Sequence, residues 1–124
     1  RASIVIYHCH DEHPELTDYY LIDLLEMIKG PFVHDAIKRC LLRTLRDKDI
    51  PENYLGIVTD QCFKFLNGHE EPVAAKVFAM DILKKVVIRI PELKDELIFS
   101  IEEQMPYQSP GFKAHAKMIL KDIT

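Results

Sequence analysis

The chain has 124 residues, of which 48% are hydrophobic and 29% are charged, and its formal net charge is -4 at pH 7. That composition is typical of a folded domain and excludes an intrinsically disordered chain. No apolar run approaches the ~20 residues that a membrane-spanning helix needs, so we expect no membrane insertion. The length predicts one domain, covering residues 1–124.

Six of the seven prolines recur at nearly even intervals. Steps of 37 to 41 residues separate the members of two interleaved series, which are Pro14, Pro51, Pro91 and Pro31, Pro72, Pro110. A helix accepts proline best at its first position, because the missing N–H has no partner there and φ is already suitable. The prolines therefore predict helix starts, and their spacing predicts an internal repeat.

Between the prolines, apolar residues recur at intervals of three and four, as in amphipathic helices. We predict seven helices joined by short connections, over residues 1–11, 14–29, 31–47, 51–66, 71–89, 91–105 and 110–122. Gly56 lies inside the fourth of these, where glycine costs about 1 kcal/mol relative to alanine. We interpret Gly56 as a position of close helix packing. Arg1 aligns with the middle of a later helix, so we also expect residues upstream of it.

The helices after Pro31, Pro72 and Pro110 share a core pattern. Ala79, Ile82 and Leu83 align with Ala116, Ile119 and Leu120, and also with Leu41, Thr44 and Leu45. Two-helix units of this length, with proline at both helix starts and this core, resemble HEAT or armadillo-type repeats. The resemblance implies an all-α, right-handed α-α superhelix of about seven helices in three and a half pairs. It also implies that first helices form a convex layer and second helices a concave, partner-binding one.

Charge is distributed unequally between these two layers. The second helices, over residues 14–29, 51–67 and 91–105, hold 11 acids and 3 bases, whereas the rest of the chain holds 9 acids and 13 bases. Opposite their apolar faces lie positions spaced i, i+4, i+7, which are Tyr19, Asp23, Glu26, then Gly56, Asp60, Phe63, then Glu96, Ser100, Glu103.

An acidic groove with a few aromatic rings attracts a basic or amphipathic peptide and repels phosphate. We therefore predict a contact site for another protein or a basic peptide, made of Tyr19, Asp23, Glu26, Asp60, Phe63, Glu96 and Glu103. The alternative is that this stripe is only the solvated face of each amphipathic helix.

The outer layer contains two sets of basic residues in matching register. They are Lys38, Lys76, Lys113 and Arg46, Lys84, Lys121. Such ladders could follow an anionic polymer, and nucleic-acid binding is the alternative function. In HEAT-like DNA glycosylases the concave face meets DNA and must be basic. Here the second helices, which the resemblance places on the concave face, are acidic. We do not expect nucleic acid to be the partner.

The segment from His8 to His13, HCHDEH, is the richest in potential metal ligands. On a helix only residues three or four apart share a face, which groups His8 with Glu12 and Cys9 with His13. Each of these pairs lacks one or two ligands of a tetrahedral site. We predict no metal and no cofactor. The three cysteines, Cys9, Cys40 and Cys62, have no CxxC spacing and favour a reducing, cytoplasmic location.

Catalytic motifs are missing from the sequence. There is no glycine-rich phosphate loop, no GxSxG, no HExxH and no CxxC. Residues 104–111, QMPYQSPG, share only the Met-Pro pair with the serine-rich loop of the adenylosuccinate lyase family, whose members are several times longer. We predict a non-catalytic binding or scaffolding module. A lyase-type or metal-dependent enzyme is the remaining alternative.

Overall fold

The computed structural model describes residues 26, 42–69 and 71–124, and all regular secondary structure within them is helical. A short helix ends at residue 47. It is followed by α5 (Glu52–Asn67), α6 (Val73–Arg89), the 3-10 turn η1 (Pro91–Leu93), α7 (Lys94–Gln104), the 3-10 turn η2 (Met105–Tyr107) and α8 (Pro110–Ile123). The four helices predicted from residue 51 onward are confirmed, with ends shifted by at most three residues, because Pro91–Leu93 form a 3-10 turn before α7. Those over 1–11, 14–29 and 31–41 lie outside the described residues, apart from Glu26, which is helical and exposed.

Four of the recurring prolines, Pro51, Pro72, Pro91 and Pro110, mark the starts of helical segments in the described part. Pro51 and Pro72 precede α5 and α6 with ψ angles of 140° and 147°, which is the extended conformation of a helix cap. Pro91 and Pro110 are the first residues of η1 and α8. The prediction that these prolines mark helix starts is confirmed, and the reason is their fixed φ and missing N–H.

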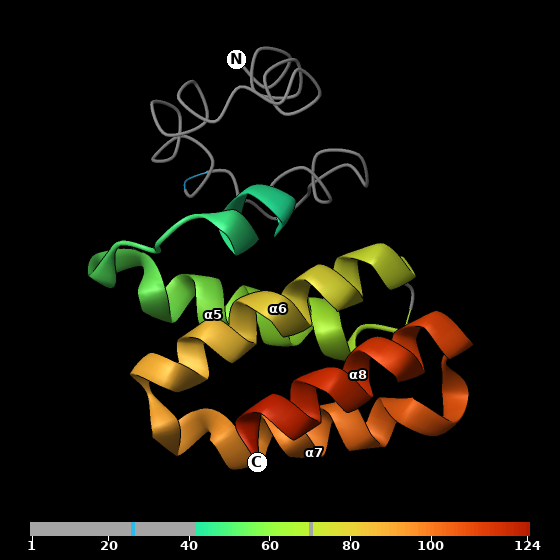
Figure 1. Ribbon diagram of the computed structural model, residues 1–124. Coiled ribbons are helices and arrows are strands. Elements are labelled where there is room, and N and C mark those ends of the chain that lie inside the picture. The colour runs from blue at the N-terminus through green and yellow to red at the C-terminus, as the bar shows by residue number, and fades with distance from the viewer. Residues whose placement is uncertain (1–25, 27–41, 70) are drawn as a thin grey trace.

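The helices form two layers. In one layer α6 contacts α8, and in the other α5 contacts α7, while α5 with α6 and α7 with α8 make the contacts between layers (Figure 1). Helices α5 and α7 therefore contact the next helix along the chain, and α5 and α6 contact the helix after that. This arrangement is expected when successive helix pairs stack in order.

The core lies between the two layers and follows the repeat predicted from the sequence. Ala79 and Ala116 are fully buried, and Ile82 and Ile119 are 0% and 1% exposed. Small residues at positions 79 and 116 let α6 and α8 approach closely. Burial of each large aliphatic side chain contributes about 1.5–3 kcal/mol, so stacking holds the pairs together.

Basic side chains of α6 bind the ends of neighbouring helices. Lys85 Nζ donates to the carbonyl oxygens of Leu45, Arg46 and Lys48 at 3.2, 2.9 and 2.5 Å. Arg89 donates to the carbonyl of Ile50 at 2.8 Å. Carbonyls at a helix C-terminus have no partner within the helix and favour cations, so these contacts join the 42–47 helix to α6.

Gly56 is exposed, and a Cβ built on it would meet no atom within 4 Å. Our expectation of close packing at this position is therefore wrong. The glycine lies on the solvent side of α5, where no neighbouring helix approaches it.

Candidate protein-binding surface

One face of α7 is exposed, acidic and centred on an aromatic ring. Phe99 is 64% exposed, whereas Leu97, Ser100 and Ile101 are buried on the opposite side of the helix. The residues around Phe99 are exposed acids at positions three or four apart, as expected for one side of a helix. We call this surface the acidic face of α7, made of Asp95, Glu96, Phe99, Glu102 and Glu103.

The four carboxylates of this face form no ion pair or hydrogen bond with another described residue. Some other acids in the described part are paired, as when Asp122 meets Lys84 at 2.7 Å and Asp81 meets His115 at 2.6 Å. The arrangement on α7 is locally unfavourable, because Glu102 and Glu103 lie in its last turn, at the negative end of the helix dipole. No basic residue occupies that turn. A cationic partner would relieve this repulsion.

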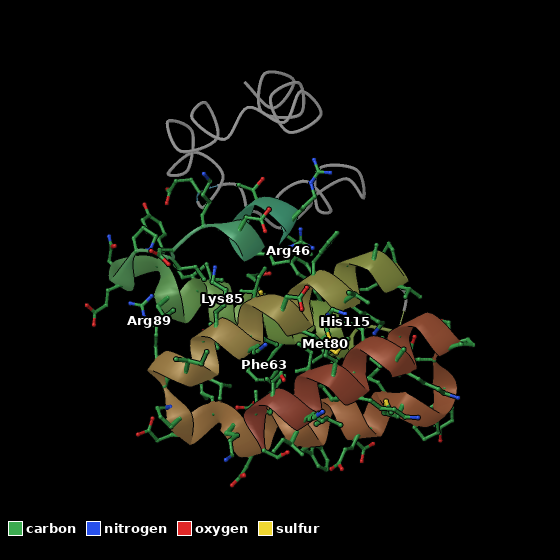
Figure 2. All side chains as sticks on the ribbon, viewed as in Figure 1. Arg46, Phe63, Met80, Lys85, Arg89 and His115 are labelled. Carbon is green, nitrogen blue, oxygen red and sulfur yellow. The ribbon has the colours of Figure 1, made fainter. Side chains whose placement is uncertain are left out.

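The neighbouring helix α5 contributes less to this surface than the sequence predicted. Asp60 is exposed, but Phe63 is half-buried and packs against the core (Figure 2). Glu26 is exposed, and Tyr19 and Asp23 lie outside the described residues. Among the predicted contact residues, Asp60, Glu96 and Glu103 are therefore the exposed acids of the two inner helices.

The predicted stripe on α7 was rotated relative to the real exposed face. Ser100 is buried, and its hydroxyl accepts a hydrogen bond from Asn67 Nδ2 at 3.5 Å. The predicted stripe followed the register of the other inner helices, whereas Leu97 and Ile101 determine which side of α7 faces the core. Sequence reasoning therefore missed Asp95, Phe99 and Glu102. The buried pair Leu97 and Ile101, spaced i, i+4, is the signal that would have found them.

A model of the HEAT repeat domain matches residues 2–123 of the chain. The chain belongs to the HEAT repeat domain family. The predicted resemblance to HEAT repeats is thus confirmed, and HEAT repeats generally mediate protein interactions and are typically non-enzymatic scaffolds. No curated protein and no solved structure matches the chain.

In this HEAT domain the predicted basic ladders are largely used within the fold. Lys76 is only 2% exposed, and its Nζ donates to the carbonyl of Leu66 at 2.7 Å and to Gln104 Oε1 at 3.2 Å. Burial lowers the pKa of Lys76, and the nearby carboxylate of Glu71 opposes that shift. Lys76 therefore cannot meet an external phosphate, contrary to our expectation for this position.

The second ladder is also partly neutralised. The guanidinium of Arg46 pairs with Asp47 at 3.1 Å and lies 4.9 Å from the ring centroid of Phe78. Lys84 is bound to Asp122. Lys113 is half-buried, Lys121 is exposed, and Lys38 lies outside the described residues. The geometry gives little support to a continuous anion-binding track on this layer.

Metal-binding side chains do not gather in the described part of the HEAT domain. No cluster of three or more His, Cys, Asp or Glu side chains suited to a metal ion occurs there, and the HCHDEH segment lies outside it. Burial raises the pKa of the Cys62 thiol above its usual range, which suppresses the reactive thiolate. None of the described helices is long and apolar enough to cross a membrane.

Proposed function

We propose that this HEAT domain is a non-catalytic interaction module that binds a basic segment of a partner protein on the acidic face of α7. The observation that carries this proposal is the set of four carboxylates around the exposed ring of Phe99, which have no partner among the described residues. Asp60 on the adjacent helix α5 is a further exposed carboxylate of the inner layer. The family supports the general role, since HEAT repeats generally mediate protein interactions.

The chemistry of the face selects the kind of partner. Lysine or arginine side chains would pair with Glu96, Glu102 and Glu103 and offset the repulsion at the end of α7. An aliphatic side chain, or the stem of a lysine, would cover the ring of Phe99. A basic amphipathic helix presents both groups at intervals of three and four residues, which matches the spacing on α7.

The predicted organisation of the remaining chain belongs to the same proposal. We infer that one domain spans residues 1–124 and that its helix pairs continue the two layers as a right-handed superhelix. Tyr19, Asp23 and Glu26 would then extend the acidic surface along the inner layer. We assign the domain to the cytoplasm, on the basis of cysteines without disulfide spacing.

A peptide titration tests this function. The probe is a fluorescent amphipathic helix with lysines on one side and leucines on the other, and binding is followed by anisotropy at low and high salt. We expect Glu103→Lys to weaken binding by about tenfold, because it removes one attraction and adds one repulsion.

The matched control is Glu52→Lys, which makes the same charge change at an exposed site on the first turn of α5. It should change the affinity less than about twofold. A second peptide, with glutamates in place of the lysines, should not bind. Equal binding by Glu103→Lys and the unmodified chain would refute the assignment of the acidic face.

A further inference from the structure

Three side chains of α6 hold the helix pair that follows it. Lys76 donates to Gln104 on α7 at 3.2 Å, while Asp81 contacts His115 at 2.6 Å and Lys84 contacts Asp122 at 2.7 Å, both on α8. These contacts define the edge of α6 that faces the next pair. The same edge exists on α8, because the two helices are equivalent in the repeat.

The equivalent positions on α8 bind no other helix in the described part of the chain. Ala79 aligns with Ala116 at a step of 37 residues, and the same step aligns the three contact positions of α6 with Lys113, Met118 and Lys121 of α8. The exposed Lys117 lies beside them. None of the lysines makes an ion pair or hydrogen bond with another described residue, and Met118 is 50% exposed. We call these four residues the basic edge of α8.

We propose that the basic edge of α8 docks onto the acidic face of α7 in a second copy of this chain, forming a two-fold symmetric dimer. This inference rests on the proposed function, because it names the partner of the same acidic face. Both surfaces are at the same end of the described stack, where α7 and α8 lie side by side (Figure 1). A two-fold axis at that end forms the contact twice, once in each direction.

Complementary charges and matching apolar residues favour a second copy of the chain as the partner. Among the residues that the structure describes, the four carboxylates of the acidic face and the three ammonium groups of the basic edge have no ion-pair or hydrogen-bond partner. Each surface has one exposed apolar residue among its charges, Phe99 on α7 and Met118 on α8. Contact between a thioether and an aromatic ring is favourable, and opposite potentials fix the register of an interface. Lys84 of α6 pairs with the carboxylate of Asp122 on α8. Lys121, the equivalent of Lys84 in the repeat, would pair in the same way with a carboxylate of the second copy.

A charge exchange tests the dimer directly. The molar mass of the 124-residue chain is measured by sedimentation velocity from about 1 to about 200 µM, a range in which mass action reveals a weak dimer. One variant carries Lys117→Glu and Lys121→Glu, and the other carries Glu96→Lys and Glu103→Lys. Each variant alone should dimerise at least about tenfold more weakly. An equimolar mixture should dimerise again, because every contact then joins a lysine surface to a glutamate surface.

Two further variants protect the interpretation. Glu52→Lys, at an exposed site in the first turn of α5, repeats the charge change of Glu96→Lys outside both surfaces and should leave the dimer unchanged. Phe99→Ala removes an exposed ring and should weaken the dimer by about fivefold or more without lowering the unfolding temperature.

A chain that stays monomeric throughout the range, or a mixture that stays monomeric, overturns the dimer. A dimer that survives both charge reversals also overturns it, because the contact then lies elsewhere. If the monomer still binds the lysine peptide through α7, only the self-association fails and the partner is a different basic protein. If the peptide does not bind either, the proposed function fails as well.

Discussion

The ammonium nitrogen of Lys85 lies 2.9 Å from the carbonyl oxygen of Arg46, which is 39 residues earlier in the chain. The same nitrogen donates to two more carbonyls at the end of that helix, so all three of its N–H bonds are used. One half-buried lysine thus closes the C-terminus of one helix against the middle of the next repeat unit. The ordered stacking of helix pairs depends on such contacts between distant parts of the sequence.

We expect Lys85→Met to lower the free energy of unfolding by about 1–3 kcal/mol at neutral pH. Methionine keeps the apolar stem but leaves three carbonyl oxygens without their donor. Urea denaturation followed by circular dichroism measures the change. Lys94→Met, at a lysine of α7 for which no side-chain hydrogen bond is found, is the control and should change stability by less than about 0.5 kcal/mol. Equal stability of the two variants would show that Lys85 does not close the helix end.

The alkaline pH dependence of stability provides a separate check on Lys85. Burial lowers the pKa of Lys85 from 10.5, and the carboxylates of Asp49 and Asp47 partly oppose this shift. Between the lowered pKa and 10.5 the unfolded chain therefore binds more protons than the folded chain, so this lysine makes the free energy of unfolding rise with pH. The stability of the unmodified chain minus that of Lys85→Met should increase from about pH 8 to about pH 10. A difference that falls over this range would contradict the assignment.

The orientation of α7 can be tested with two neighbouring apolar residues. Leu97 is fully buried and Phe99 is 64% exposed. We expect Leu97→Ala to cost about 2–5 kcal/mol, because it removes core contacts and leaves a cavity. Phe99→Ala should change stability by less than about 0.5 kcal/mol. The reverse order in thermal or urea unfolding would place the acidic surface on a different side of the helix.

Gly56 offers a stabilising substitution. Its missing side chain faces open space in a regular helix, so Gly56→Ala should raise the free energy of unfolding by about 0.5–1 kcal/mol. At Gly68 a Cβ would lie 2.7 Å from Glu71 Cγ and 3.1 Å from the carbonyl of Lys64. Gly68→Ala should therefore give no gain or a loss. A loss of stability at position 56 would indicate a packing role that the structure does not show.

Much of the fold could be predicted because its signals are local. Pro51, Pro72, Pro91 and Pro110 begin helices through properties of the residue itself, and the aligned Ala79 and Ala116 are buried as their repeat spacing requires. These signals need no knowledge of distant contacts. The family match over residues 2–123 agrees with the repeat read from the prolines.

The site was predicted less well because its details depend on helix phase and on long-range contacts. The predicted stripe on α7 followed the register of the other inner helices, whereas Leu97 and Ile101 determine the buried side, so Ser100 is buried and Phe99 is exposed. Lys76 looks like a surface lysine in the sequence. Its burial follows from carbonyl and amide partners 10 and 28 residues away, which periodicity cannot identify.

The most direct measurement of the central claim is a residue-by-residue NMR titration of the labelled chain with the lysine and leucine peptide. The amide signals of residues 95–103 on α7 should shift in proportion to the bound fraction, and those of Glu96 and Glu103 should be among the largest. Signals of the buried α6 core around Ala79 should stay in place. Shifts confined to other helices, or no shifts at concentrations where anisotropy reports binding, would contradict a binding role for the acidic face of α7.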